Sequence, residues 1–498
     1  MKSTRQNMKA SGSDEGVGER TAAPGARTYL RLDILTAVAV VIGLVLVLAT
    51  SRARRTEQFL AQLRAKGEKL TYRELTGGDS AITNPAPQVV TNAANAFEAL
   101  DYSASDLDFS FFPRPGRMRV AWKQAAVPDK RPGKTVRWEE LANYLQRASE
   151  PLEALREVLT TAPPEWGRRT NHSQASLQNF SSIDCARWLC AATISELHAN
   201  QLELALRDLE VLGALVRADT LDYSLISAIV RTGVGHLGLW ATWQAGQAEG
   251  WSDQQLERLQ RTWADLDLPE AVEHGLLGER VCGIGYWEQF RRSDRRQVMG
   301  LFTGSPQARG SYKTALRLWV AWPAYKITSM DADEVLYLDT MGGAIDEARQ
   351  IRAHRPWDRR KSKAAFAARI NQTTRPLTRW RYTLSGAFLP NYTEVLEHAV
   401  RTETLRQLTL TAIAIKRYHL RHHSPPPDLA ALVPEFLKSP TYDPMSGGPL
   451  RYRPGENGEF LLYSIGEDGQ DDGGDPRPSA GSKLDLWEGR DAVFPSAE

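Results

Sequence analysis

One short stretch of the sequence, residues 461–475 (LLYSIGEDGQDDGGD), carries side chains suited to binding a cation. It places five acidic residues and four glycines in fifteen positions. Calcium takes about six to eight oxygen ligands, from carboxylates and from backbone carbonyls of a flexible loop. Glycine reaches the positive φ angles that turn carbonyls inward. A calcium loop and a solvated acidic turn both fit this composition, although the spacing is not that of an EF-hand. The charge comes from four aspartates: Asp468, Asp471, Asp472 and Asp475.

Two other motifs favour structural roles. The sequence GVGHLG, residues 233–238, matches the GxGxxG pattern of dinucleotide-binding turns. That turn needs a preceding strand and an acid at the end of the next strand. Helical patterns flank the motif here, so we expect glycines that let two helices pack closely. His419, His422 and His423 stand directly before a triproline that ends the helix, which predicts a solvated helix end rather than a metal site.

No catalytic constellation is visible in the sequence. The chain contains no HExxH, GxSxG or Walker motif. Glu273, His274 and Glu279 form a lone group of ionisable residues in one helical segment, and we expect them at the surface or neutralised by a neighbouring helix. We therefore expect that the protein is not an enzyme. The three cysteines cannot form a disulfide framework and should be buried thiols: Cys185, Cys190 and Cys282.

The balanced overall charge of the chain does not favour binding to nucleic acids. The chain has 62 lysines and arginines against 60 aspartates and glutamates, a formal net charge of +2. So balanced a composition creates no general field that would attract a polyanion. We expect no nucleic-acid partner.

A membrane anchor is predicted near the N-terminus. Residues 34–50 (ILTAVAVVIGLVLVLAT) contain no charged side chain, and arginines flank them on both sides. Seventeen residues at about 1.5 Å each span about 26 Å, close to the lower limit for a transmembrane helix. With its flanks, the predicted helix covers residues 29–52. A cleaved signal peptide is the alternative, but roughly thirty residues before the apolar run is long for its n-region.

The remaining patterns predict a mainly α protein. Leu141, Leu145 and Leu152 recur at helical spacing, and the residues around HANQ, 198–201, should separate two helices. Ser252 is a plausible N-cap of the next helix. After a helix from about 400 to 421 come a short second helix and the segments PLRYR, PGENG and EFLLYSIG, which predict strand, turn and strand. The expected units are a disordered tail (1–28), the transmembrane helix (29–52), a juxtamembrane helix and linker (53–97), an α-helical hairpin domain (98–399) and a small α+β domain (400–498).

Residues 443–475 (DPMSGGPLRYRPGENGEFLLYSIGEDGQDDGGD) resemble the C-terminal half of the major pseudopilin of type II secretion systems. That family has a DPWGNPYxY segment, a strand and an LYSxGxDGxxGG loop that binds calcium. The resemblance implies a calcium ion held by Asp468, Asp475 and the carbonyl of Ile465. It covers about a fifth of the chain. The chain as a whole also resembles a group of bacterial membrane-anchored helical proteins, which implies an architecture but no activity.

The N-terminal part departs from the pseudopilin pattern. Pseudopilins carry a Gly/Phe processing site and a glutamate in the N-terminal helix, whereas this chain has GARTYLRLD before its apolar run. HHSPPP also replaces the Gly-x-Tyr-Pro turn of the family. The resemblance therefore implies a shared domain rather than a role as a pseudopilus subunit.

These observations together predict a single-pass protein of the bacterial inner membrane. A loosely built calcium site binds at about 10⁻⁴ to 10⁻³ M, as in extracellular modules, and this places the bulk of the chain outside the cytoplasm. The arginines that follow the anchor favour the opposite orientation. We expect an extracytoplasmic scaffold or partner-binding protein with structural calcium. The alternatives are an accessory component of a type II secretion-like system and an envelope hydrolase that uses Glu273, His274 and Glu279.

Overall fold

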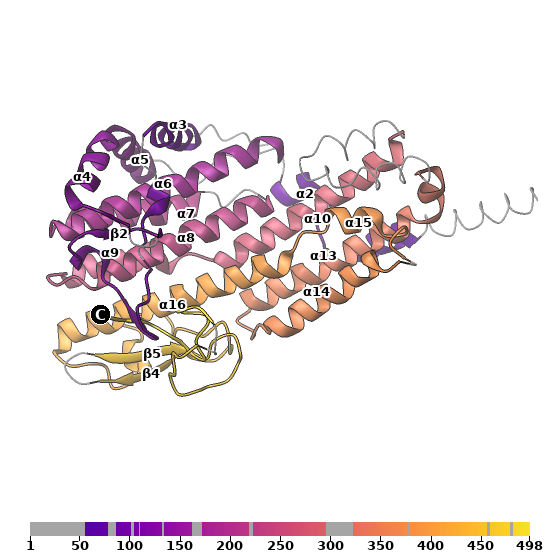
Figure 1. Ribbon diagram of the computed structural model, residues 1–498. Coiled ribbons are helices and arrows are strands. Elements are labelled where there is room, and N and C mark those ends of the chain that lie inside the picture. The colour runs from indigo at the N-terminus through magenta and orange to yellow at the C-terminus, as the bar shows by residue number, and fades with distance from the viewer. Residues whose placement is uncertain are drawn as a thin grey trace, which may run out of the picture.

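The computed structural model is mainly helical with little strand. This confirms the predicted mainly α class. Figure 1 shows an elongated molecule whose long helices run along its length, with the C-terminal strands below them. The structure describes residues 55–77, 86–100, 104–108, 110–131, 134–161, 172–218, 223–294, 322–376, 378–455, 459–478 and 482–498.

The first half of the helical body is a set of antiparallel hairpins. α6 contacts α3, α7 and α8, and their buried faces share one apolar cluster. α6 ends at His198 and α7 begins at Leu202, with Asn200 at a φ of 58°, which confirms the break predicted around HANQ. The helices of this half are α3 (Ala86–Glu98), α4 (Trp138–Arg147), α5 (Ser149–Thr161), α6 (His172–His198), α7 (Leu202–Ala218), α8 (Leu225–Gly246) and α9 (Asp253–Ala264).

The second half has a separate apolar cluster. Leu75, Trp287 and Leu338 are buried in it, so the segment that follows the predicted anchor packs onto this half. Residues 55–65 are helical, as the sequence predicted for the juxtamembrane segment. The elements here are α2 (Tyr72–Thr76), α10 (Leu268–Arg292), a helix over residues 322–328, α13 (Met330–Arg352), α14 (Arg359–Thr374) and α15 (Thr383–Phe388).

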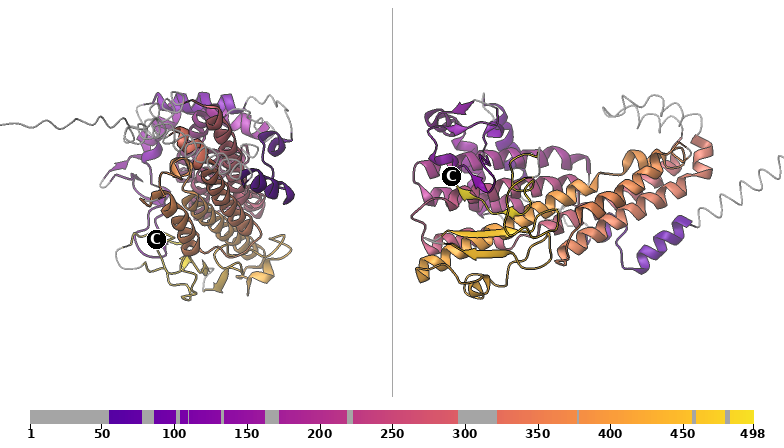
Figure 2. Two further views of the ribbon diagram at one scale, coloured as in Figure 1. Left: turned by 90° about the vertical axis from the view of Figure 1, so that its right-hand side faces the viewer. Right: turned by 60° about the horizontal axis from the view of Figure 1, so that its bottom comes forward.

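One helix, α16 (Tyr392–His422), joins all parts of the molecule. Leu396 lies in the cluster of the second half, Leu405 in that of the first half, and Leu408 in a third cluster formed with the C-terminal strands. Figure 2 shows α16 running from one half to the other. The helix begins earlier than the predicted residue 400, and the predicted domain boundary at 399/400 lies within it.

The C-terminal region confirms the predicted hairpin and adds a third strand. β4 (Arg451–Pro454) and β5 (Phe460–Ser464) pair antiparallel, and β6 (Ala492–Val493) pairs with the other edge of β5. The predicted short second helix is a single 3₁₀ turn, η4 (Leu429–Leu432), capped by Asp428.

The last residues return to the helical body. β7 (Ser496–Ala497) pairs in parallel with β1 (Arg117–Met118), and the indole of Trp243 donates to the Pro495 carbonyl at 2.9 Å. The remaining short elements nearby are η1 (Ala104–Asp106), η2 (Ala121–Lys123), β2 (Val127–Pro128) and β3 (Thr135–Val136). Because of these contacts, residues 400–498 share their core with the helices rather than standing apart.

The GVGHLG motif lies inside α8, which confirms its helical setting. A Cβ atom on Gly238 would lie 2.4 Å from the Trp263 ring, so only glycine lets α8 approach α9 this closely. Ser252 caps α9 as predicted, accepting from the Gln255 amide at 3.2 Å.

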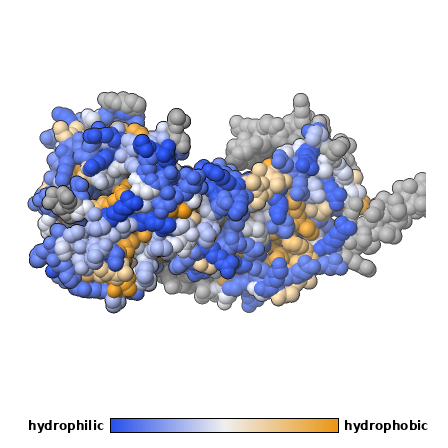
Figure 3. All heavy atoms as spheres, turned by 90° about the horizontal axis from the view of Figure 1, so that it is seen from below, coloured by the Kyte–Doolittle hydropathy of each residue, from blue (hydrophilic) through white to orange (hydrophobic). Residues whose placement is uncertain are grey.

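The predicted membrane span, residues 34–50, lies outside the described residues. Among the residues that the structure does describe, none of the helices combines the length and the apolar character needed to cross a membrane. Figure 3 shows the lower face of the molecule, where hydrophilic residues predominate and hydrophobic ones gather in separate areas on each half.

Candidate functional site

The acidic loop leaves the end of β5 with the backbone conformation that its glycines predict. Gly466, Gly469, Gly473 and Gly474 all have positive φ angles, between 71° and 87°. Asp468 is half-buried and accepts from the Gln470 amide at 3.0 Å. The loop is therefore a folded turn with a defined path, which both the calcium loop and the acidic turn would require.

Arginines bind two of the predicted ligands. The Asp471 carboxylate accepts from Arg451 Nε at 3.1 Å and from the Tyr463 hydroxyl at 3.1 Å. The Asp475 carboxylate accepts from Arg477 Nη2 at 2.8 Å and from Arg490 Nη1 at 3.3 Å. Hydrogen bonding to Arg477 lowers the pKa of Asp475 to about 2. A calcium ion bound by these carboxylates would have to compete with the arginines for them.

Asp491, which belongs to none of the motifs in the sequence, organises the loop from outside it. Its buried carboxylate accepts from the amides of Gly474 at 2.7 Å, Asp475 at 3.2 Å and Asp472 at 3.4 Å. Burial raises the pKa of Asp491. Three loop N–H groups therefore face this carboxylate, while the Asp475 carbonyl accepts from the Asp491 amide at 3.0 Å.

The predicted calcium ligands are close in sequence, but their side chains do not converge. Asp471 and Asp472 are exposed, and Ile465 is buried with its amide donating to Asp443 Oδ2 at 3.2 Å. Nowhere in the described part of the chain are three or more Asp, Glu, His or Cys side chains grouped as a metal ion would need. The calcium site stays a prediction.

Two further acids attach the loop to the rest of the protein. Asp443 is fully buried and accepts from the Ser464 hydroxyl at 2.6 Å and the Met445 amide at 2.9 Å. Glu467, the acid at the start of the loop, accepts from Arg401 Nε of α16 at 2.6 Å and from Arg359 of α14 at 2.9 Å. The loop is thereby held against the helical body.

A cleft of about 480 Å³ opens beside this region, between the helical body and residues 434–442. α9, α16, the first turn of α10 and the last turn of α13 form its other walls. Its charged lining residues are Glu257, Arg261, Asp265, Asp267, Arg352, Glu403, Arg406, Arg417, Glu435 and Lys438.

The interior charges of the cleft are paired. Glu403 accepts from Arg406 at 2.7 and 2.8 Å, from Gln407 at 2.8 Å and from the Tyr442 hydroxyl at 3.2 Å. Burial, together with the adjacent Glu403 carboxylate, raises the pKa of Tyr442. The His354 ring stacks on Tyr442 with a centroid distance of 3.7 Å. At the rim the ion pairs are exposed: Arg261 lies 3.5 Å from Glu257, and Lys438 lies 3.5 Å from Asp265.

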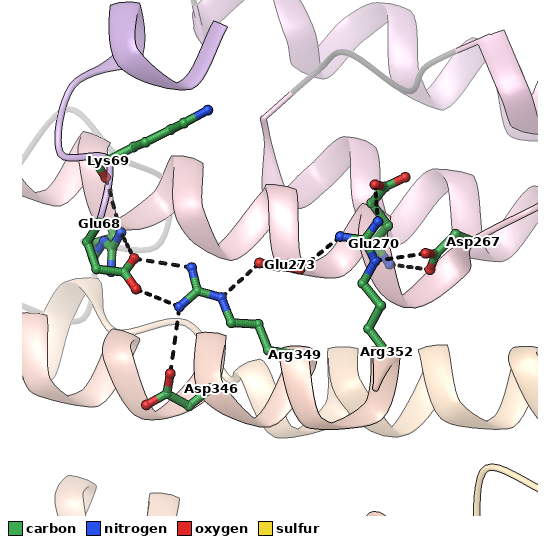
Figure 4. Close-up of polar contacts among 9 residues, drawn as sticks. Glu68, Lys69, Asp267, Glu270, Glu273, Asp346, Arg349 and Arg352 are labelled. Atoms are coloured by element: carbon green, nitrogen blue, oxygen red, sulfur yellow. Dashed lines mark hydrogen bonds and ion pairs between the residues drawn. The ribbon is translucent and has the colours of Figure 1, made fainter. Parts of the chain in front are cut away.

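Of the candidate hydrolase residues, Glu273 lies in an ion-pair network. In Figure 4, Arg349 stands between Glu68 and Glu273, and its Nε donates to Glu273 at 2.9 Å. Arg352 approaches the same glutamate at 3.4 Å, so a neighbouring helix neutralises Glu273, as one of the sequence interpretations expected. Burial raises the pKa of Glu279 and lowers that of His274. The cleft is not lined by any of the three.

The structure confirms the solvated end of α16 and two of the three buried thiols, but not the third, Cys282. His419, His422 and His423 are exposed at the end of α16. Cys185 and Cys190 are buried free thiols, and burial raises the pKa of Cys190 to about 12. Cys282 is only half-buried.

Compared with known protein families, curated proteins and solved structures, the chain gives no match. The resemblance of its C-terminal region to pseudopilins therefore stays a prediction.

Proposed function

We propose that this protein is a membrane-anchored, extracytoplasmic scaffold that binds a protein partner in the cleft between its helical body and residues 434–442. The observation that carries the proposal is the composition of this cleft. Its interior is fixed by buried charges that are paired, whereas the charges at its rim, of both signs, form exposed ion pairs. Structural calcium in residues 465–475 belongs to the same proposal.

Binding fits the cleft better than catalysis. A general base needs a lone pair that can reach a substrate proton. Glu403 receives four hydrogen bonds from Arg406, Gln407 and Tyr442, so its oxygens are already occupied. The burial that raises the pKa of Tyr442 also keeps this phenol protonated at neutral pH.

The charges at the rim favour a polar protein segment as the occupant. Arg261 pairs with Glu257 and Lys438 with Asp265, but exposed ion pairs are weak, so these groups can exchange their present partners for charged side chains of a bound protein. Exposed groups of this kind contribute to orientation and partner selection more than to affinity. The stacked rings of Tyr442 and His354 offer an aromatic surface, which is enriched at protein interfaces.

A second candidate, an accessory subunit of a type II secretion-like system, has one supporting observation. The two strands that the sequence pattern predicts are present as β4 and β5, and the following loop has the predicted glycine conformations. In that case the partner of the cleft would be a component of the secretion machinery.

Site-specific photo-crosslinking in intact bacteria tests the proposal. A photoreactive residue at Arg261, on the rim, should give a discrete adduct with one partner. The same residue at Glu139, exposed on α4 across the helical body, serves as the matched control. Lys438→Glu should weaken the adduct formed from position 261 because it reverses a rim charge. Identical adduct patterns from both positions would contradict a partner site in the cleft.

A further inference from the structure

A second cavity, of about 260 Å³, lies on the other side of α16, between this helix, α8, α9 and the C-terminal end of the chain. Its walls are mostly apolar and include Trp243, Leu259, Ile413, Phe460 and Phe494. This volume has room for on the order of ten heavy atoms, at close to 30 Å³ each, the share of a water molecule in the liquid. The cavity is therefore suited to a small molecule rather than to a protein segment.

One face of α16 brings polar groups into this apolar cavity. Thr409, Ala412, Ile413 and Lys416 follow one another at helical spacing and all line it. The Lys416 ammonium donates to the carbonyl of Gly246, the last residue of α8. Two further charged residues line the cavity, Arg117 and Glu459, and both are exposed.

Thr409 is an unusual threonine within α16. The hydroxyls of Thr402, Thr404 and Thr411 each donate to the backbone carbonyl four residues earlier. The Thr409 side chain is 2% exposed, yet its hydroxyl has no hydrogen-bond partner. A buried hydroxyl without a partner costs about 1–3 kcal/mol, and a ligand group could satisfy it.

Lys416 caps the C-terminal end of α8, but this contact uses only part of the hydrogen-bonding capacity of its ammonium group. Side chains cap the last carbonyls of α8, and Lys416 is one of them, beside Gln247, Trp122 and Trp251. An ammonium has three donors, and one carbonyl accepts only one of them. Burial lowers the pKa of Lys416, which shows that its charge is poorly solvated here.

We propose that this cavity binds a small apolar carboxylate, with the carboxylate at Lys416, an aromatic body against Trp243, Phe460 and Phe494, and a second polar group facing Thr409. Thr409 and Lys416 are two helical turns apart, about 10 Å along the axis, so a single carboxylate does not satisfy both. A hydroxyaryl carboxylate has the required arrangement, with polar groups at the two ends of an apolar ring.

Three probes of nearly equal size test the assignment: 4-hydroxyphenylacetate, phenylacetate and 2-phenylethanol. Their dissociation constants are measured by titration calorimetry on the full chain in lipid nanodiscs, with empty nanodiscs as the blank. We expect phenylacetate to bind at least about tenfold more tightly than the alcohol, because hydrogen bonds to a charged group are stronger than neutral ones. 4-Hydroxyphenylacetate should bind more tightly still. Equal binding of acid and alcohol, or no binding of any probe at millimolar concentration, overturns the proposal.

Four variants assign the contacts. Lys416→Met should reduce the affinity for phenylacetate to that for the alcohol, whereas Lys361→Met, which changes an exposed lysine of α14 outside the cavity, should leave the preference unchanged. Thr409→Val should abolish only the difference in affinity between 4-hydroxyphenylacetate and phenylacetate. Ala412→Phe should fill the cavity and abolish binding of all three. If Lys416→Met does not fold, the other two cavity variants decide: unchanged binding in Ala412→Phe overturns the site.

Discussion

The Asp491 carboxylate accepts a hydrogen bond of 2.7 Å from the backbone amide of Gly474, across 17 positions of sequence. Through this contact and those to Asp472 and Asp475, a buried acid outside the loop fixes the path of the loop. The acidic loop is therefore shaped by an internal anion, whether or not a cation also binds to it.

Asp491→Asn should destabilise the protein by about 1–3 kcal/mol, because the loop amides lose a charged acceptor in a buried place. Chemical denaturation followed by tryptophan fluorescence measures the change. Asp472→Asn, which alters an exposed carboxylate of the same loop, should have little effect. Equal stabilities of the two variants would show that the charge of Asp491 does not hold the loop.

Calcium at about 2 mM should slow amide hydrogen exchange in residues 465–475 of the full chain by roughly five- to tenfold, for a dissociation constant of a few tenths of a millimolar. Magnesium should do less, because it requires a tighter octahedral shell. Asp468→Ala and Asp475→Ala should abolish the effect. If exchange is the same in calcium and in chelator, the loop is an acidic turn only.

Removal of a competing arginine should strengthen calcium binding. Arg477→Ala frees the Asp475 carboxylate from its closest partner. It should therefore lower, by several-fold, the calcium concentration at which amide exchange in residues 465–475 reaches half of its full slowing. Arg453→Ala removes the same charge from the neighbouring strand β4 and controls for the general electrostatic effect. Equal shifts in both variants would rule out a specific competition at Asp475.

Gly238→Ala should destabilise the protein by about 1–3 kcal/mol, because its new methyl group would overlap the Trp263 ring. Gly233→Ala lies in the same GVGHLG motif, and its Cβ would make only an ordinary contact with Ile183, at 3.9 Å. This control should be neutral, or stabilising by up to about 1 kcal/mol through helix propensity. Thermal unfolding compares the two, and similar losses would argue against helix packing as the specific role of Gly238.

Stability should fall as the pH rises through the range in which Glu196 titrates. Arg156 binds both Glu196 and Asp208, and burial, together with the Asp208 carboxylate, raises the pKa of Glu196 to about 8. Between about pH 4.3, where an unfolded glutamate titrates, and pH 8 the folded state binds the additional proton. Stability contributed by protonated Glu196 is therefore lost over this window.

Glu196→Gln should remove this part of the pH dependence, because glutamine stays neutral. Urea denaturation at pH 5 and pH 8 gives the free energy of unfolding of both proteins. Between these two pH values, that of the variant should rise relative to that of the wild type by about 2 kcal/mol or more. Glu157→Gln, an exposed residue of α5, should follow the wild type. If the stabilities of the wild type and of Glu196→Gln change with pH in parallel, Glu196 is not the titrating group.

The proposed location makes a separate prediction. A reporter enzyme that is active only outside the cytoplasm should be active when fused after Glu498, and the protein should stay in the membrane fraction after a carbonate wash, since hydrophobic insertion resists high pH. An active cytoplasm-only reporter at the same position would reverse the proposed orientation. A soluble product that begins near Arg54 would instead identify a cleaved signal.

The sequence by itself determined the elements whose pattern is local. The N-cap at Ser252, the break around Asn200 and the hairpin of β4 and β5 depend on residues that are close together in the sequence, and the structure has all three. The positive φ angles of the loop glycines belong to the same class, because glycine lacks the Cβ atom that forbids them elsewhere.

Only the tertiary structure decided which charges meet. The partners of the loop come from two other segments, Arg451 from β4 and Arg490 with Asp491 from the residues just before β6, and no spacing rule links them to the loop. The same holds for the pairing of β7 with β1, nearly four hundred positions apart, since two-residue strands carry no periodic signal. Both cavities also arise where α16 passes between distant segments, so their lining exists only once the chain has folded around that helix.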